Sequence, residues 1–541
     1  MIFIVLIIAA ILRFYQLGSL PPAMDWDEVS NAYNGYSILK TGSDEFGQSF
    51  PILFRAYDGY VPPVLIWLNS ISTGIFGLNE LAARIPNAVL GTLTILGIYL
   101  LVKQVAGKEK QSLALFSALF LAITPWHIVY SRVNTFALTP VFFIVWGLYF
   151  FWASLEKGRF LVVSTIFFML AIFSYFSAYI FVPMFVLALA VTYRKKFEFK
   201  NIILALVPIF LSALLILFVL PGGQNRLRGI SIFNDPDTVK IAAEEAQGEG
   251  LEGRILHNRR FVYAQEILKG YFVNFRGDFL FAKGDAVERM VVTGSGFGLL
   301  LVWFLPFLIT GVFHLVSEKP KGWTIWILWL LLAPIAAATS LPQPVSTRTT
   351  LMSVPLVIIT AYGFYNFARS RLILSKILLL LLAFNIYLFA HQYFVHFPVE
   401  KSDKWFWGYD ELFDYLNTPE NFSKKVHFVY GQPDPLDQIH MFLLFYNKID
   451  PVKWQANGGT RLGCIGTTGQ FRFERYDFIP YSCLTKPIDW ESFKNDDLIV
   501  TSKLIDGSYL DKIEYLDGKD AFYVYEYDSL QQQLENFIID I

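Results

Sequence analysis

The chain has 541 residues, of which 55% are hydrophobic, 17% are aromatic and only 16% are charged. Its mean hydropathy is +0.45. A soluble domain carries about 25% charged residues, so this composition excludes a soluble enzyme, a disordered scaffold and a fibrous repeat. The net charge of −1 provides no basic field for nucleic acid. The sequence therefore indicates a protein built mainly from membrane helices.

Apolar segments that could cross a bilayer recur from residue 1 to about 391. The first runs from Met1 to about Tyr15, and no small-residue cleavage site follows it. We therefore expect a retained span rather than a cleaved signal peptide. The other candidates are residues 61–78, 85–102, 112–130, 137–155, 160–174, 179–193, 201–220, 297–316, 323–340, 351–368 and 372–391.

The distribution of positive charge predicts the topology, because short cytoplasmic loops are rich in Lys and Arg. Short loops nearly free of positive charge, at 131–136, 175–178 and 341–350, alternate with basic ones. The alternation is kept if 61–78, which is polar for a span, lies at the outer surface. We thus predict a multi-pass cell-membrane protein with eleven crossings and a cytoplasmic N-terminus. The basic loops contain Lys103/Lys108/Lys110, Lys157/Arg159, Arg194/Lys195/Lys196/Lys200, Lys319/Lys321 and Arg369/Arg371/Lys376.

This topology places three large pieces on the outer face: loop 18–84, loop 221–294 and a tail from residue 392. Within the tail, short apolar runs at 426–430, 498–500 and 521–525 predict strands, and 435–447 predicts a helix. The fold expected is an all-α membrane domain over 1–391, with juxtamembrane helices outside, and a small α/β domain over 392–541. Cys464 and Cys483 fall in this tail, where a disulfide and two unpaired thiols are equally compatible with the sequence.

An acidic stretch follows the first predicted span. Asp25 and Glu28 have the spacing of a capping box, and Thr41-Gly42 ends the helix that this box would begin. The apolar residues of this helix recur at helical spacing, so we expect it to lie at the membrane surface. Capping explains Asp25 and Glu28 but not Asp27, which is the acid that we predict to be catalytic.

Arg132 follows Ser131 at the outer end of the span 112–130. An arginine at this boundary is suited to binding a lipid phosphate. It is equally suited to a purely structural role as an interfacial anchor.

Several motifs stand in a characteristic order: the acidic pair Asp27-Glu28, the turn Tyr60-Val61-Pro62-Pro63, a run from Phe76-Gly77-Leu78-Asn79-Glu80 to Arg84-Ile85-Pro86, and Ser131-Arg132. Together they resemble the dolichyl-phosphate-mannose–protein mannosyltransferase family, which is glycosyltransferase family 39 with the GT-C fold and includes the bacterial aminoarabinose lipid A transferase among its relatives. The resemblance covers about residues 20–150. A weaker likeness continues through Arg259, 278–281, Gly284-Asp285 and 407–409.

The resemblance implies transfer of a sugar from a polyprenyl-phosphate donor to an acceptor hydroxyl outside the cytoplasmic membrane. It implies that Asp27 and Glu28 are the catalytic residues, with Asp27 as the general base and Glu28 supporting the acceptor or the geometry of the site, and that Arg132 holds the donor phosphate. Many relatives carry Lys where this chain has Val61, and an acid shortly after Ser-Arg that is missing here. Arg55, Arg259 or Arg348 would then supply the missing cation, whereas a divalent metal has no support in the sequence and no cofactor is predicted. The partners implied are the lipid-linked donor, membrane lipids and a protein, lipid or glycan acceptor.

Other functions stay open. An oligosaccharide transferase or a polysaccharide ligase or polymerase of similar fold is compatible with the same motifs. A secondary transporter is less compatible, because transport sites usually place ionisable residues near mid-membrane, whereas these acids and arginines cluster at the outer ends of the spans.

Overall fold

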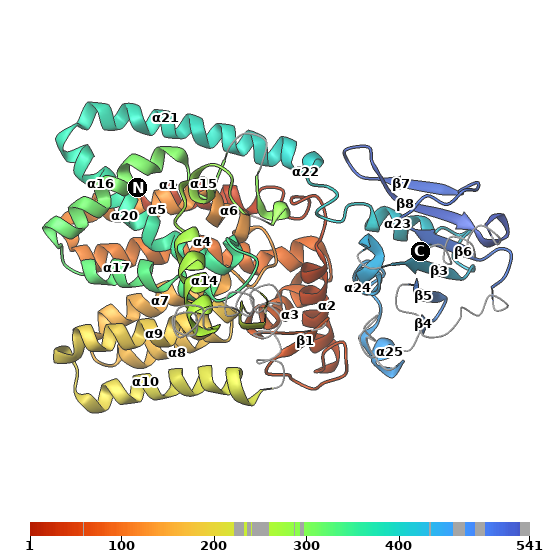
Figure 1. Cartoon of the computed structure of the whole chain (residues 1–541), viewed down its shortest axis with the longest axis horizontal. Helices are drawn as coiled ribbons and strands as arrows, with labels where there is room; N and C mark the ends of the chain where they lie inside the picture. The colour runs from red at the N-terminus through yellow and green to blue at the C-terminus, as the bar shows by residue number, and fades with distance from the viewer. Residues whose placement is uncertain are drawn as a thin grey trace, which may run out of the picture. The chain divides into compact units, whose positions relative to one another are not determined.

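The structure, a computed structural model, describes residues 1–57, 59–220, 232–234, 240, 259–285, 287–292, 297–431, 434–457, 471–481 and 493–530 (Figure 1). These form two compact units. The first unit comprises Met1–Tyr15, Gly59–Leu65 and Ile85–Tyr393, and the second comprises Gln16–Asp58, Ile66–Arg84 and Phe394–Ile541.

The first unit is helical, as the apolar segments predict. Its helices are α1 (Ile2–Phe14), α4 (Glu80–Ala106), α5 (Gln111–Ile123), α6 (Pro125–Ser131), α7 (Thr139–Ser154), α8 (Phe160–Ile172), α9 (Phe176–Tyr193), α10 (Phe199–Leu214), α14 (Arg259–Val273), α15 (Gly277–Phe281), α16 (Leu305–Glu318), α17 (Trp323–Leu332), α18 (Ile335–Ala338), α19 (Ser346–Thr349), α20 (Ser353–Ser370) and α21 (Leu372–His391).

Within the described residues, five helices are long and apolar enough to cross a membrane. A sixth candidate is α5 with α6, which are bent by 60° at the break before Pro125, since proline cannot continue the helix. The remaining candidates are apolar helices of 10–17 residues, including α3 (Val64–Phe76). The predicted apolar segments are therefore confirmed as helices, and the number of crossings stays a prediction.

Glycines allow α16 and α20 to pack closely in the first unit. A Cβ atom added to Gly311 would clash with the carbonyl oxygen of Ile359, and one added to Gly363 would clash with that of Phe307. Small residues at a helix crossing are the usual means by which membrane helices approach each other.

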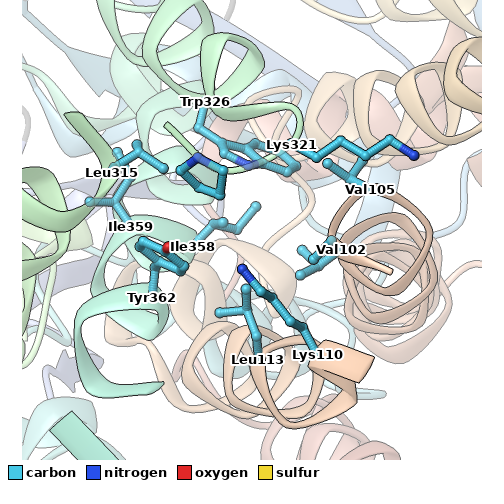
Figure 2. A pocket seen from close by; sticks show the side chains of 12 residues that line it. Val102, Val105, Lys110, Leu113, Leu315, Lys321, Trp326, Ile358, Ile359 and Tyr362 are labelled. Atoms are coloured by element: carbon cyan, nitrogen blue, oxygen red, sulfur yellow. The ribbon is translucent and has the colours of Figure 1, made fainter. Parts of the chain in front are cut away.

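Residues of several basic loops lie together in the first unit. Lys110 and Lys321 line one cavity of about 390 Å³, and the ammonium of Lys110 points toward the ring of Tyr362 (Figure 2). Lys321 also lies 5.6 Å from the ring of Trp152, which packs against Tyr193 just before the basic segment at 194–196. Residues of basic loops that are far apart in the sequence thus lie close together in the first unit. Which side of a membrane this end faces stays a prediction.

The second unit contains α2 (Trp26–Thr41), β1 (Phe54–Ala56), most of α3, the start of α4 as far as Arg84, and the tail. The short strand β2 (Gly59–Val61) belongs to the first unit. The tail forms a six-stranded sheet in the order β4-β5-β3-β6-β8-β7, in which β3 runs parallel to β5 and β6. Its elements are α22 (Phe397–Glu400), α23 (Tyr409–Leu416), β3 (Val426–Tyr430), α24 (Ile439–Tyr446), α25 (Pro451–Ala456), β4 (Phe471–Phe473), β5 (Tyr476–Pro480), β6 (Leu498–Thr501), β7 (Asp511–Glu514) and β8 (Asp520–Glu526).

The three predicted strands and the predicted helix of the tail are therefore confirmed. In the same unit α2 packs on α24, and Val29 and Tyr33 of α2 share a core with Phe442 of α24. The polar side chains that make segment 61–78 unusual for a span are buried, because Asn69 and Ser70 of α3 lie directly against Gly35 of α2. Cys464 and Cys483 lie outside the described residues.

Candidate functional site

The acidic stretch begins α2 as the sequence predicts. Oδ1 of Asp25 accepts a hydrogen bond from the backbone N–H of Asp27 at 2.7 Å, and Oε2 of Glu28 accepts one from the backbone N–H of Asp25 at 3.3 Å. This is a capping box. At the other end, Gly42 has a φ of 70°, the left-handed conformation that commonly ends a helix.

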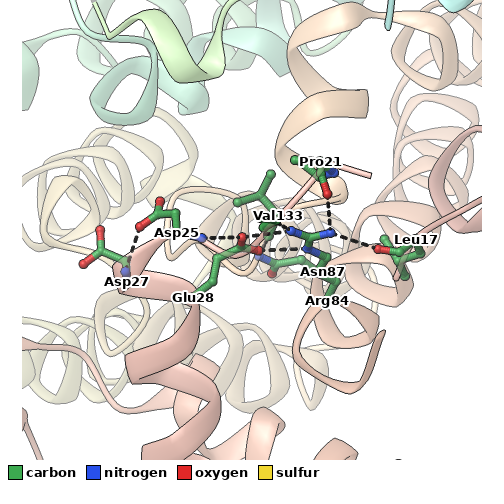
Figure 3. Close-up of polar contacts among 9 residues, drawn as sticks. Leu17, Pro21, Asp25, Asp27, Glu28, Arg84, Asn87 and Val133 are labelled. Atoms are coloured by element: carbon green, nitrogen blue, oxygen red, sulfur yellow. Dashed lines mark hydrogen bonds and ion pairs between the residues drawn. The ribbon is translucent and has the colours of Figure 1, made fainter. Parts of the chain in front are cut away.

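Glu28 has a second, stronger partner that sequence reasoning missed. Both of its carboxylate oxygens accept hydrogen bonds from Arg84, each at 3.2 Å (Figure 3). The pair is buried, with exposed fractions of 0% for the side chain of Arg84 and 1% for that of Glu28. Arg84 lies in the Phe-Gly-Leu-Asn-Glu motif region, so a signal existed, but nothing in the spacing pairs it with Glu28.

Arg84 also fixes the chain that leads into α2. Its guanidinium donates to the carbonyl oxygens of Leu17, Pro21 and Ala23, at 3.3, 2.9 and 2.5 Å. A planar guanidinium with five donors is suited to holding a carboxylate and several carbonyls at once. The Glu28–Arg84 pair therefore holds the loop before α2 in one conformation.

Asp27 has different surroundings from its two acidic neighbours. It is half-buried, and its carboxylate points away from the Glu28–Arg84 pair (Figure 3). The negative charge of Asp27 acts on the nearby phenol of Tyr57. The hydroxyl of Tyr57 donates a hydrogen bond to the carbonyl oxygen of Trp26 at 2.6 Å. Burial, followed by the nearby Asp27 carboxylate, raises the pKa of Tyr57 well above its ordinary value, so Tyr57 is a neutral donor.

Aromatic rings accumulate beside this turn. The ring of Trp26 lies 5.3 Å from that of Phe406 and 6.5 Å from that of Tyr57, and the ring of Tyr57 meets His440 edge-on at 6.4 Å. Burial lowers the pKa of His440 to about 4, so this imidazole is neutral at pH 7. Trp26, Tyr57, Phe406 and His440 thus form an uncharged aromatic cluster at the start of α2.

Arg132 is completely buried in the first unit. Its guanidinium donates to the carbonyl oxygens of Leu12 at 3.1 Å and Tyr15 at 2.7 Å, and it lies 5.6 Å from the ring of Tyr393. These carbonyls belong to the C-terminal end of α1, where backbone acceptors lack intrahelical partners and a cation is favourable. The geometry favours the structural role that the sequence left equally compatible with phosphate binding.

The three alternative cations lie in different places. Arg55 of β1 is exposed and stacks 4.6 Å from the ring of Phe46. Arg348 is half-buried on α19 and donates to Oγ of Ser340 and to the carbonyl oxygen of Pro342, each at 3.1 Å. Arg259 is the first residue of α14, and its side chain lies outside the described part.

The predicted residues therefore fall in both units. Asp27, Glu28 and Arg55 belong to the second unit, and Arg132, Arg259 and Arg348 belong to the first. Among the described residues, no group of three His, Cys, Asp or Glu side chains could hold a metal ion.

Residues 60–220 match the model of the dolichyl-phosphate-mannose-protein mannosyltransferase family, which confirms the resemblance carried by the motifs. The chain is 25% identical over 245 residues to a putative mannosyltransferase, YkcB of Bacillus subtilis, a match that covers 43% of this chain and 32% of YkcB. It is 32% identical over 160 residues to an uncharacterized protein of Aquifex aeolicus, covering 29% and 30% of the two chains. It thus spans about a third of the length of these relatives.

Among solved structures, ArnT from Cupriavidus metallidurans bound to undecaprenyl phosphate matches with a TM-score of 0.54. The match covers 97% of both chains at 14% identity. This likeness shows that the chain shares the fold of that structure; in this chain the fold comprises a helical unit and a C-terminal sheet domain.

Proposed function

We propose that this protein is a membrane glycosyltransferase that moves a sugar from a polyprenyl-phosphate donor to an acceptor hydroxyl on the extracytoplasmic face. The family match and the ArnT-like fold support a glycosyltransferase with a lipid-phosphate donor. Mannose is the sugar to test first, because the matching family is described by it. The acceptor class, whether protein, lipid or glycan, is for the assay to identify.

One observation supports the assignment of the general base. Of the acids at the start of α2, Asp25 serves the cap and Glu28 serves the pair with Arg84, while the Asp27 carboxylate points away from both (Figure 3). We assign Asp27 the base role and Glu28 a positioning role. In this proposal Glu28 contributes to catalysis only by holding the turn that carries Asp27.

In the reaction proposed, the acceptor oxygen forms a bond to the anomeric carbon while the bond from that carbon to the phosphate oxygen breaks. The proton of the acceptor hydroxyl passes to the Asp27 carboxylate, and the polyprenyl phosphate leaves with the electron pair. A leaving phosphate needs cations to stabilise its charge. Arg55, Arg259 and Arg348 are the candidates that we propose for this purpose ahead of the buried Arg132.

The test is transfer by the purified full chain in detergent or nanodiscs, with mannosyl-phosphate polyprenol offered alongside other polyprenyl-phosphate sugars. Acceptor-dependent release of polyprenyl phosphate is expected in the wild type and is expected to be lost in Asp27→Asn. Asp25→Asn is the matched control, because it removes one charge from the same turn and Asn is also a good N-cap. The proposal would be overturned if lipid phosphate were released at the same rate with every donor sugar and also in Asp27→Asn.

A further inference from the structure

A groove in the first unit is separate from all the residues discussed for catalysis. It lies between α16, α20 and α21 and encloses about 1450 Å³, part of it open to the surroundings. One stripe of α16 faces it, because Pro306, Thr310, His314 and Glu318 recur every four residues. The last two turns of α20 form the second wall, and Leu378 of α21 contributes to the third.

The groove has both apolar and polar walls. Trp303, Phe307, Phe367 and Leu378 supply apolar surface, and the side chain of Trp303 is 40% exposed. Asn366, Arg369 and Ser370 bring polar groups from the end of α20. A surface with this combination, on helices apolar enough to lie in a bilayer, fits an amphiphile better than a water-soluble ligand.

The charges of the groove favour an anionic headgroup. Arg369 is exposed, with its guanidinium 5.7 Å from the ring of Tyr365. The one acid of the lining, Glu318, is already engaged: its Oε1 lies 2.7 Å from Nδ1 of His314, and its Oε2 accepts a hydrogen bond from the hydroxyl of Tyr362 at 2.6 Å. Both carboxylate oxygens therefore already have polar partners within the protein, whereas the guanidinium of Arg369 is exposed at the groove.

Basic side chains near the groove add to its preference for an anionic headgroup. Tyr362, which donates to Glu318 of the groove, also lines the cavity of Figure 2, where Lys110 lies 5.7 Å from its ring and Lys321 contributes to the same lining. Basic pockets between membrane helices at the cytoplasmic boundary bind anionic lipid headgroups, and the predicted topology places these loops at that boundary.

We propose that the groove between α16, α20 and α21 binds an anionic glycerophospholipid of the surrounding bilayer, with the lipid phosphate on Arg369 and an acyl chain along Phe307, Phe367 and Trp303. The lipid fills the space between α21 and the α16–α20 pair. This site is independent of the donor and acceptor in the proposed function, so failure of either proposal leaves the other standing.

The test is native mass spectrometry of the purified full chain with added phosphatidylglycerol or phosphatidylcholine. A Lys or Arg near an anionic headgroup contributes about fivefold in affinity. We therefore expect the wild type to retain phosphatidylglycerol about fivefold better than phosphatidylcholine. In Arg369→Gln we expect the two lipids to be retained about equally well. Arg371→Gln is the matched control, since it removes the same charge from the same helix end but does not line the groove.

A second variant tests the shape of the site without a change of charge. The indole of Thr310→Trp is expected to fill the groove, so this variant should retain neither lipid. If this variant does not fold, the comparison of the two arginine variants alone tests the proposed lipid site. Equal loss in Arg369→Gln and Arg371→Gln would overturn the proposal in favour of general surface attraction. Displacement of phosphatidylglycerol by equimolar undecaprenyl phosphate would overturn it in favour of a polyprenyl site.

Discussion

The three acids at the start of α2 occupy different surroundings although they lie within four residues of each other. Asp25 caps the helix, Glu28 is buried against Arg84, and Asp27 is half-buried with its carboxylate directed elsewhere. Local geometry therefore separates roles that residue type alone does not. This separation makes each acid testable by a substitution that removes one charge and little volume.

For Asp27→Asn, we expect transfer to fall by about 10²–10⁴-fold, because asparagine cannot accept the proton of the acceptor and base catalysis contributes about this factor. Binding of the donor should be nearly unchanged. Initial rates of lipid phosphate release, with donor binding measured separately, check this. Parallel losses of activity and melting temperature in Asp27→Asn and Asp25→Asn would contradict the base assignment.

For Glu28→Gln, we expect a loss of stability rather than a specific loss of chemistry. Breaking a buried ion pair by removing one partner costs about 3–5 kcal/mol, because it leaves Arg84 charged and uncompensated. Thermal unfolding in detergent is the measurement. Full stability combined with abolished transfer would instead make Glu28 a direct participant.

For Arg132→Ala, the structure leads us to expect destabilisation with donor affinity preserved. The carbonyls of Leu12 and Tyr15 lose their donors, at about 1–3 kcal/mol for each buried group left without a partner. Melting temperature and polyprenyl-phosphate affinity should be measured on the same preparation. A large loss of affinity in a fully stable variant would restore Arg132 as a phosphate ligand.

At the scale of elements, a buried polar cluster in the tail links β3, β5 and the residue before β6. Nδ1 of His427 on β3 lies 3.2 Å from Oδ2 of Asp477 on β5, and Nε2 lies 3.0 Å from Oδ2 of Asp497, which precedes β6. The three side chains are at most 5% exposed, and Phe493 stacks on the imidazole at 3.8 Å. The imidazole thus links two buried carboxylates.

For His427→Gln, we expect the sheet to lose about 1–3 kcal/mol, because a glutamine amide has one nitrogen and cannot replace both contacts of the imidazole with the buried carboxylates. Asp477 keeps the guanidinium of Arg472 at 3.2 Å as a partner. Far-ultraviolet circular dichroism during thermal unfolding would report the loss. Lys453→Gln, at an exposed pair with Glu474, serves as a control and should change stability by less than about 1 kcal/mol. Equal effects of the two substitutions would show that the cluster adds nothing to the sheet.

At the scale of the whole molecule, the grouping of basic loops gives the predicted topology a structural counterpart, since loops distant in sequence bring Lys110 and Lys321 to one cavity. A cysteine at Lys195 should resist an impermeant thiol reagent in intact cells, and one at Ser43 should react. The native cysteines are replaced first. Labelling at Lys195 from outside would reverse the predicted orientation.

The sequence by itself determined what depends on neighbours along the chain. Short and long hydrophobic runs were enough for the apolar helices of the first unit and for β3, β6 and β8, because the apolar side chains of each segment favour its burial. They did not predict α14 and α15, which lie in the long loop at 221–294. The capping box of Asp25 and Glu28 was also predictable, since its partners are three residues apart. Order and spacing of the motifs likewise sufficed for the family resemblance.

Only the tertiary structure decided the pairings between distant residues. Glu28 meets Arg84 across 56 positions, Arg132 meets the end of α1 across 120, and His427 meets Asp497 across 70. It likewise decided that α2 shares its core with α24 of the tail. No periodicity encodes such contacts, because they exist only after the helices and strands have packed. Packing therefore determines which charged side chains are buried as structural partners and which remain to be tested as a site.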